Sequence, residues 1–453
     1  MTQPAHSSPS EVERSRVADA EVSRPMSAPR QPIAVIGTGY VGLVTAAGFA
    51  ELGSQVWCVD VDAGKIAQLQ RGEIPIYEPG LAESVARNRE RLHFSTKLAS
   101  ALEHARLLFV AVGTPPTYSG DADLSAVHDV VGAMPPSDHH ALVMKSTVPV
   151  GTGAAIKRIF AEQGKAGFGY VSCPEFLKEG SALEDFLAPD RVVVGDEGDW
   201  AGDAVVELYS VLDAPVVRTD IASAEMVKLA ANAFLATKIS FINEIANVCE
   251  ETGADVLEVA RGMGLDQRIG QHFLKPGIGF GGSCFPKDVS ALKQLAGNSG
   301  YHFQLLTAVI EVNELQKRRV IGKLHKHLGS LVGRTVALLG LAFKANTDDM
   351  REASSLILSA RLQADGAKVR AYDPIAETEA RKLMTGVEFA DSALDAVAGS
   401  DACIIVTEWP EFAELDWRAV AERMSGRLVI DGRNFVDPTT VRAAGFIYEG
   451  IGR

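Results

Sequence analysis

Apolar and polar positions near the start of the chain change from the period of a strand to that of a helix and back. Residues 33–36 form a short β-branched run, which predicts a buried strand. The pattern then becomes helical as far as Leu52, and residues 55–59 predict a second strand. This order of elements predicts a βαβ unit, from which parallel sheets are built.

The same alternation continues along both halves of the chain. The segments "ARLLFVAVGTPP" and "HALVMKSTVPVGT" predict further strands, which lead to Thr114 and Thr147. Towards the C-terminus, "RTVALLGLAFKANTDDMR", "AKVRAYDP" and "SDACIIVTEWP" repeat this series weakly, and Asp373 closes the second strand. An internal repeat of this kind predicts a second Rossmann-like half.

The middle of the chain predicts helices, because residues 222–328 lack β-branched runs. One long helix should end at Gly253, and its apolar positions lie on more than one side, as expected at a domain or subunit boundary. We therefore expect an α/β fold with two Rossmann-like domains, at 31–221 and 329–453. A long central helix and a helical domain at 222–328 should join them, and residues 1–30 should form a disordered tail.

Composition limits the class of protein. The chain has 453 residues, of which 47% are hydrophobic and 23% charged, as in globular proteins of several domains. No apolar run approaches the ~20 residues of a membrane span, and the first thirty residues lack the apolar core of a secretory signal. The net charge of -14 argues against a nucleic-acid partner.

Cysteine and histidine usage points to the cytosol and to no metal. The five cysteines are too few, too scattered and odd in number for a disulfide framework, so a cytoplasmic location is expected. The ten histidines lack metal-ligand spacing with cysteines or carboxylates.

The turn after the first predicted strand carries a dinucleotide fingerprint. Gly37, Gly39 and Gly42 are spaced as GxGxxG, and the following helix would present its free N–H groups to a pyrophosphate. Asp60, at the end of the second strand, would accept hydrogen bonds from the adenosine ribose and repel a 2'-phosphate, which favours NAD over NADP. A glycine-rich turn without a ligand is the alternative. Lys65 is either near the adenosine or a solvated helix lysine.

The stretch "GFGGSCFPKD" places a thiol next to glycines and a helix start. Gly281 and the next glycine let the backbone pass close to a ligand, and Pro286 suits the first turn of a helix. Cys284 would lie ahead of that helix, whose dipole is expected to lower the pKa of the thiol. Asp288 lies over the same turn. The alternative is a free cysteine that only packs, which fits Cys58, Cys249 and Cys403 better.

Cationic residues accompany these two signals. Lys228 and Asn232 are four apart on the long helix and project from one face, although a surface lysine is the simpler interpretation of Lys228. The second half has Lys344, Arg351 and Arg433 in loops after its strands, which suit a phosphate held by side chains.

A thiol beside a nicotinamide has a specific use. Oxidation of an alcohol needs only hydride transfer and a proton acceptor. Oxidation of the resulting aldehyde needs a tetrahedral adduct from which a second hydride can leave, and a cysteine supplies it as a thiohemiacetal. The thioester that follows is hydrolysed to an acid, so the pattern suggests oxidation of an alcohol to a carboxylate.

With these segments in order, the chain resembles the UDP-glucose/GDP-mannose dehydrogenase family from residue 32 to the C-terminus. The similar segments are "GTGYVGL", "IYEPGL", "KSTVPVGT", "PEFLKEG", "GFGGSCFPKD", "GLAFKANTDDMR" and "DGRN". The resemblance implies two Rossmann-like domains joined by a long helix that also forms the core of a homodimer.

The resemblance also implies roles for individual residues. Cys284 corresponds to the nucleophile, Lys228 and Asn232 to stabilisers of an oxyanion, and Thr147 and Asp288 to a pair that holds a water. Glu175 corresponds to the residue that activates the hydrolytic water. The remaining cofactor positions are Gly37, Gly39, Tyr40, Val41, Gly42, Asp60, Lys65, Thr114, Thr147, Glu179 near the nicotinamide and Arg351 at the diphosphate. The positions around the nucleotide sugar are Glu175, Phe176, Leu177, Lys228, Asn232, Lys275, Phe280, Gly281, Lys344 and Arg433.

Within the family, the residues around the thiol favour one branch. Phe285 and the preceding "KPGIGFGG" are more similar to the branch that oxidises UDP-glucose to UDP-glucuronate than to the GDP-mannose branch, and Ser283 replaces the histidine of the UDP-N-acetylmannosamine branch. Other nucleotide sugars, a two-electron hydroxyacid dehydrogenase and a sensor without turnover are the alternatives.

Overall fold

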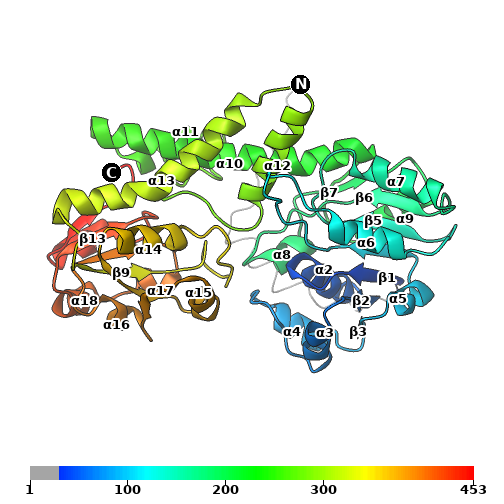
Figure 1. Ribbon diagram of the computed structural model, residues 1–453, viewed down its shortest axis with the longest axis horizontal. Coiled ribbons are helices and arrows are strands. Elements are labelled where there is room, and N and C mark those ends of the chain that lie inside the picture. The colour runs from blue at the N-terminus through cyan, green and yellow to red at the C-terminus, as the bar shows by residue number, and fades with distance from the viewer. Residues whose placement is uncertain (1–29) are drawn as a thin grey trace, which may run out of the picture.

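The N-terminal half forms a wound α/β sheet. The computed structural model describes residues 30–453 (Figure 1). The predicted tail lies outside the described residues except for Arg30, which begins the first strand and donates a hydrogen bond to the Leu208 carbonyl at 2.8 Å. The strands are β1 (Arg30–Ile36), β2 (Ser54–Val59), β3 (Leu92–Ser95), β4 (Leu107–Val110), β5 (Ala141–Met144), β6 (Gly169–Ser172), β7 (Val192–Gly195) and β8 (Val216–Thr219).

Their order in the sheet is β3-β2-β1-β4-β5-β6-β7-β8. The first six run parallel, whereas β7 pairs antiparallel with β6 and parallel with β8. The helices of this half are α2 (Tyr40–Glu51), α3 (Ala63–Gln70), α4 (Leu81–Arg87), α5 (Leu98–His104), α6 (Ser125–Ala133), α7 (Thr152–Glu162), α8 (Ala182–Leu187) and α9 (Trp200–Tyr209).

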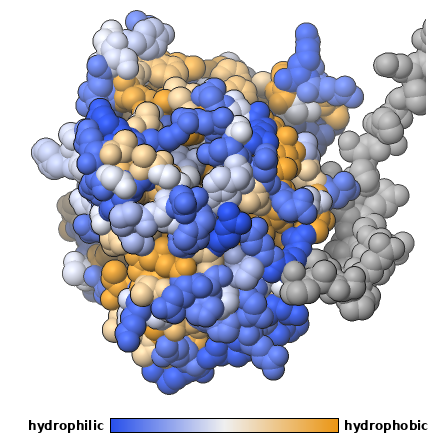
Figure 2. All heavy atoms as spheres, turned by 90° about the vertical axis from the view of Figure 1, so that its right-hand side faces the viewer, coloured by the Kyte–Doolittle hydropathy of each residue, from blue (hydrophilic) through white to orange (hydrophobic). Residues whose placement is uncertain are grey.

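Helices cover both faces of this sheet, which explains why its strands read as continuous apolar runs. In β4, Leu107 and Phe109 belong to the core on one face, while Leu108 and Val110 belong to the core on the other. Figure 2 shows the end of the molecule that carries this half, where hydrophilic and apolar side chains are intermixed.

The C-terminal half repeats the arrangement with six strands. They are β9 (Thr335–Leu339), β10 (Lys368–Tyr372), β11 (Val387–Phe389), β12 (Ala402–Ile405), β13 (Leu428–Asp431) and β14 (Ile447–Glu449), in the order β11-β10-β9-β12-β13-β14. Its helices are α14 (Ser354–Ala364), α15 (Glu377–Leu383), α16 (Ala393–Val397), α17 (Pro410–Ala413), α18 (Trp417–Arg423) and α19 (Pro438–Ala443).

The two halves share details as well as strand order. In the first, the Gly37 N–H donates to the Val59 carbonyl at 2.7 Å and the Thr38 N–H to Asp60 at 2.7 Å. In the second, the Gly340 N–H donates to the Tyr372 carbonyl at 2.8 Å and the Leu341 N–H to Asp373 at 2.6 Å. The predicted fold with two Rossmann-like halves is confirmed.

Four helices connect the halves: α10 (Ile221–Thr252), α11 (Val256–Gly264), α12 (Phe285–Asn298) and α13 (Gln304–Leu328). The 32-residue α10 begins with Asp220, whose side chain accepts from the Ser223 N–H, and ends at Gly253 with φ of 76°. Figure 1 shows α10 running from one half to the other, with α13 crossing it. Between residues 30 and 453, none of these helices combines the length and apolar character needed to cross a membrane.

Candidate active site

The dinucleotide loop has the shape that a pyrophosphate requires. Gly37 has φ of 93°, which only glycine adopts without strain, and a Cβ on Gly42 would lie 1.8 Å from the Gly37 carbonyl oxygen. A Cβ on Gly39 would have no heavy atom within 4 Å, so this side of the loop is open. No side chain caps α2, which leaves its first N–H groups directed at the opening. The residues present therefore fit NAD.

Asp60 lies at the end of β2 beside this loop. Its carboxylate accepts from the Thr38 N–H at 2.7 Å and the Thr38 hydroxyl at 2.8 Å, and the Lys65 ammonium lies 3.4 Å away. Burial alone would raise the pKa of Asp60, but hydrogen bonds from Asp62 and Thr38 and the charge of Lys65 lower it below its usual value. The acid is thus held ionised at the edge of the loop. Further along the sheet, the Thr114 hydroxyl donates to the Thr147 carbonyl at 2.9 Å.

A buried ion pair joins α10 to the loop after β6. The Lys228 ammonium lies 3.0 Å from Glu175 Oε1, and both side chains are almost fully buried. Burial alone would lower the pKa of Lys228, but the charges of Glu175, Cys284 and Asp288 raise it. The simpler interpretation of Lys228 as a surface lysine is wrong.

One turn further along α10, Asn232 meets the start of α12. Its amide donates to Asp288 Oδ2 at 2.6 Å, and Lys287 lies 2.6 Å from Asp288 Oδ1. Asp288 is completely buried, so these two donors satisfy a carboxylate that burial would otherwise penalise. The spacing of four along α10 therefore brings Lys228 and Asn232 to the same region, as the sequence predicted.

Cys284 is the N-cap of α12, and Pro286 lies in the first turn as predicted. The expected lowering of the thiol pKa is wrong. Burial raises the pKa of Cys284 to about 11, and Glu175 adds to the rise while Lys228 opposes it. A helix dipole contributes only about 0.3–1 kcal/mol at most surface sites, which is less than burial costs a thiolate here. Cys284 is therefore a thiol at neutral pH in this arrangement.

The glycines before Cys284 lie against the C-terminal half. A Cβ on Gly281 would be 2.2 Å from the Glu352 carbonyl oxygen, and one on Gly282 would be 2.8 Å from the Phe343 ring. These glycines were predicted to let the backbone pass close to a ligand, but in the structure their close neighbours are residues of the C-terminal half. Contact of Gly281 with a substrate stays a prediction.

Side chains from the C-terminal half and from α13 hold this loop in place. Arg433 donates to the Gly279 carbonyl at 2.8 Å and to the Val406 carbonyl at 2.8 Å. The Asn313 amide pairs with the Phe280 backbone at 2.8 and 3.0 Å. Asn313 was not predicted, because it lies within the regular helix α13 and no motif marks it.

The segment that contains Glu175 turns back on itself. Glu175 Oε2 accepts from the Leu177 N–H at 2.6 Å, which leaves Oε1 for Lys228. The Phe176 ring lies 3.6 Å from the Arg191 guanidinium and 5.3 Å from the Lys228 ammonium. Arg191 is a second residue that sequence analysis missed, since it follows a loop outside the quoted motifs.

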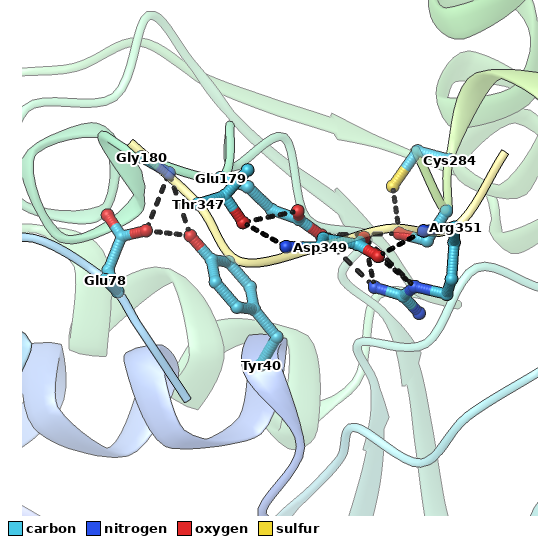
Figure 3. A network of polar contacts seen from close by, with 9 residues as sticks. Tyr40, Glu78, Glu179, Gly180, Cys284, Thr347, Asp349 and Arg351 are labelled. Carbon is cyan, nitrogen blue, oxygen red and sulfur yellow. Dashed lines mark hydrogen bonds and ion pairs between the residues drawn. The ribbon is translucent and has the colours of Figure 1, made fainter. Parts of the chain in front are cut away.

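Glu179 connects this segment to the C-terminal half (Figure 3). Its carboxylate lies 3.4 Å from the Ser283 hydroxyl, the Thr347 hydroxyl and an Arg351 nitrogen. Burial raises the pKa of Glu179 to about 7, with Asp349 adding to the rise and Arg351 and Lys344 opposing it.

Two of the predicted cations differ in their surroundings. Burial lowers the pKa of Lys344, although Glu179 and Glu78 oppose this change. Lys344 is half-buried in the loop after β9, whereas Lys275 is exposed to solvent. The structure thus brings together residues at the thiol from three segments, and contact of Lys275 with a substrate stays a prediction.

Comparison with known proteins matches all three parts of the chain to one family. Residues 31–213 match the NAD binding domain of the UDP-glucose/GDP-mannose dehydrogenase family, 222–315 its central domain and 337–438 its UDP binding domain.

Individual relatives are similar over nearly the whole chain. The UDP-glucose 6-dehydrogenase TuaD of Bacillus subtilis is 49% identical over 93% of this chain and 93% of its own. A UDP-glucose 6-dehydrogenase of Pseudomonas aeruginosa is 46% identical over 93% of this chain and 97% of its own. Among solved structures, a UDP-glucose dehydrogenase from Pyrobaculum islandicum superposes with a TM-score of 0.88 at 39% identity, covering 95% of this chain and 99% of that one.

Proposed function

We propose, since the chain belongs to the UDP-glucose/GDP-mannose dehydrogenase family, that it oxidises UDP-glucose to UDP-glucuronate. It is an NAD-dependent oxidoreductase, and its substrate is a UDP-sugar. The choice of glucose as the sugar is supported by relatives of 46% and 49% identity that carry the name UDP-glucose 6-dehydrogenase.

The buried groups around Cys284 carry this proposal. Lys228 and Glu175 form one buried pair and Asn232 and Asp288 another, and both pairs lie next to the only cysteine that is not fully buried among residues 30–453. A two-electron hydroxyacid dehydrogenase would not need the thiol, which would then only pack. A sensor without turnover would need neither the buried ion pair nor the buried, hydrogen-bonded carboxylate at the thiol.

Each residue has a task in the proposed reaction. The Cys284 sulfur adds to the aldehyde carbon of the intermediate, and the resulting oxyanion is stabilised by the Lys228 ammonium and the Asn232 amide. Loss of hydride from this thiohemiacetal leaves a thioester. Glu175 takes a proton from the water that cleaves the thioester, which restores the thiol and releases the acid. NAD held at the loop of residues 37–42 would supply the hydride acceptor, one molecule for each of the two oxidations.

The pKa of about 11 for Cys284 defines one requirement of this chemistry. The thiol must lose its proton as the sulfur–carbon bond forms, because only the thiolate is a strong nucleophile. The carboxylates of Glu175 and Asp288 are the nearby proton acceptors whose charges act on Cys284. Thr147 and Asp288 are proposed to hold a water on that proton path.

The test of the proposed function is a count of NADH per acid formed. Purified protein should be incubated with NAD and, separately, UDP-glucose, UDP-N-acetylglucosamine, UDP-N-acetylmannosamine and GDP-mannose. We expect two NADH per product with UDP-glucose, followed by absorbance at 340 nm, and UDP-glucuronate identified by mass. One NADH per product would indicate a two-electron enzyme, and turnover of another sugar alone would correct the substrate.

Cofactor choice provides a prediction that depends on Asp60. The carboxylate should repel the 2'-phosphate of NADP, so kcat/KM should favour NAD by at least roughly 100-fold, equivalent to about 2.7 kcal/mol. Asp60→Ala should lower the ratio of kcat/KM for NAD to kcat/KM for NADP about tenfold. Initial rates with both cofactors measure the ratio, and Asp62→Ala, which removes a nearby acid from the α3 cap, is the control. Equal kcat/KM for both cofactors in the unmodified protein would contradict the assignment.

We also propose that two copies associate through α10. Phe234, Phe241 and Val248 follow one another at intervals of seven along this helix and are 65%, 48% and 57% exposed. Leu315 on the adjacent α13 is 63% exposed. Such a stripe of apolar side chains on one helix is typical of a subunit interface.

Phe241→Asp should weaken self-association by at least roughly 100-fold, because it would bury a charge in the proposed interface. Light scattering during size-exclusion chromatography gives the mass, which should change from two chains to one. Glu251→Gln, at an exposed position of α10, should leave the mass unchanged. A single-chain mass for the unmodified protein would refute the dimer.

The cytosol is the proposed location. All five cysteines of the chain are free thiols. A reducing compartment keeps them in that form, including the one proposed as nucleophile.

A further inference from the structure

Glu78 forms three strong hydrogen bonds beside the candidate site and has no role in the scheme above. It lies in the "IYEPGL" segment just before α4 and is 5% exposed. Its Oε1 accepts from the Ala182 N–H at 2.6 Å, and its Oε2 accepts from the Gly180 N–H at 2.7 Å. The Tyr40 hydroxyl donates to the same Oε2 (Figure 3).

These partners belong to two functional segments. Tyr40 is the first residue of α2 and directly follows Gly39 of the dinucleotide loop. Gly180 lies in the turn after Glu179, and Ala182 is the first residue of α8. One carboxylate therefore fastens the turn that carries Glu179 to the helix that begins at the cofactor loop.

The other side of Glu179 is held only loosely. Its carboxylate contacts Ser283, Thr347 and Arg351 at 3.4 Å, which is long for hydrogen bonds to a carboxylate. The Ser283 hydroxyl in turn lies 3.5 Å from the Cys284 sulfur. The contacts of 2.6–2.7 Å made by Glu78 are shorter, and with the Lys178 N–H bond to Asp185 at 2.8 Å they hold the turn in place.

The turn is also the place where the two halves abut. Gly180 has φ of 86°, and a Cβ there would lie 3.0 Å from the Asn346 Cβ of the C-terminal half. A small displacement of the turn would therefore move Glu179 relative to Arg351 and to the thiol segment together.

We propose that Glu78 is a positioning residue, which sets the Glu179 carboxylate against Ser283 and Arg351 and so links the dinucleotide loop to the thiol site. This inference rests on the proposed function for its kinetic consequence. A positioning role explains why the buried Glu78 carboxylate accepts both from backbone N–H groups that follow Glu179 and from the Tyr40 hydroxyl. The electrostatic balance at Glu179, where Asp349 opposes Arg351 and Lys344, makes its position matter for charge near the thiol.

Glu78→Gln is the test, because it keeps the size of the side chain. In either orientation of the new amide, its NH2 group faces an N–H or O–H donor from which the carboxylate accepted a hydrogen bond, so that bond is lost. We expect kcat to fall about tenfold, while KM for NAD and for UDP-glucose each change less than about threefold. Glu83→Gln, at an exposed position in α4, should behave like the unmodified protein. Tyr40→Phe removes one donor and keeps both backbone contacts, so kcat should fall only two- to threefold, roughly.

A second measurement does not need turnover. The alkylation rate of Cys284 by iodoacetamide, without nucleotides, is followed by the mass of its peptide. The other four cysteines are buried, so Cys284 should react first. Glu78→Gln should change this rate at least about threefold, because the neighbours of the thiol shift. If Glu78→Gln does not fold, Tyr40→Phe must itself change the alkylation rate relative to the unmodified protein, and an unchanged rate would overturn the inference.

Three results would overturn the inference. The first is an unchanged kcat together with an unchanged alkylation rate, and the second is a fall in melting temperature alone. The third is a rise of more than about tenfold in KM for NAD alone, which would place Glu78 in the cofactor site. If the unmodified protein does not oxidise UDP-glucose, the proposed function fails, and the alkylation rates still decide the positioning role.

Discussion

Cys284→Ala should abolish formation of UDP-glucuronate, with kcat lower by at least roughly a thousandfold, because the second oxidation then lacks its covalent adduct. The variant should still fold and bind both nucleotides, since Cys284 is partly exposed and forms only a long contact of 3.5 Å with Ser283. Acid formation is measured by mass and NADH by absorbance, and calorimetry measures both affinities.

Cys284→Ser is the sharper variant of the pair. Its hydroxyl is far less ionised than a thiol near neutral pH, and an ester is hydrolysed more slowly than a thioester. Turnover should therefore nearly stop, and an adduct should add mass to the peptide that contains residue 284. Cys249→Ala, at a buried cysteine of α10, controls for the loss of any thiol. If Cys284→Ala produced acid at the rate of the unmodified protein, the thiol would have no role in the reaction and the proposed mechanism would be wrong.

Lys228→Met should lower kcat by roughly 100- to 1000-fold, as expected when a group that stabilises an oxyanion is removed. It should also destabilise the protein by about 3–5 kcal/mol, because Glu175 would remain buried without its cation. Activity at saturating substrate and urea unfolding measure the two effects separately.

Two matched variants separate charge stabilisation from packing. Lys238→Met, ten residues along the same helix and outside the site, should retain activity. Lys228→Met combined with Glu175→Gln should recover much of the lost stability and none of the activity, since the unpaired charge is removed but the oxyanion still lacks its partner. Full activity in the single variant would show that Lys228 has only a structural role.

The sequence predicted the fold well because its signals are local. The β-branched runs, the GxGxxG turn and the glycine at residue 253 each depend on neighbouring residues alone, and they identified β1, α2, β2 and the end of α10. The pairing of Lys228 and Asn232 with groups of other segments was not predictable in this way. The spacing of four placed them on one face, and only the tertiary fold gave them Glu175 and Asp288 as partners.

The pKa of Cys284 shows where local reasoning fails. The start of α12 favours a thiolate, as the sequence indicated, but burial and the charge of Glu175 come from residues distant in the chain and outweigh it. The same applies to Glu78, whose motif was recognised without a role. Its three partners are 38 to 104 residues away, so no pattern within the motif predicts them.

The repeated halves end their second strands with the same acid in different surroundings. Asp60 lies at the open cofactor loop, where its side chain is 10% exposed. Asp373 is 2% exposed, and its carboxylate accepts from the Leu341 and Ala342 N–H groups and from the Trp409 indole at 3.0 Å. The indole N–H occupies one acceptor position of Asp373, and the Ile375 and Ala376 N–H groups occupy others. The second half therefore keeps the scaffold of a dinucleotide fold but satisfies its second-strand acid with its own N–H groups, so we expect Asp60 and not Asp373 to bind a ribose.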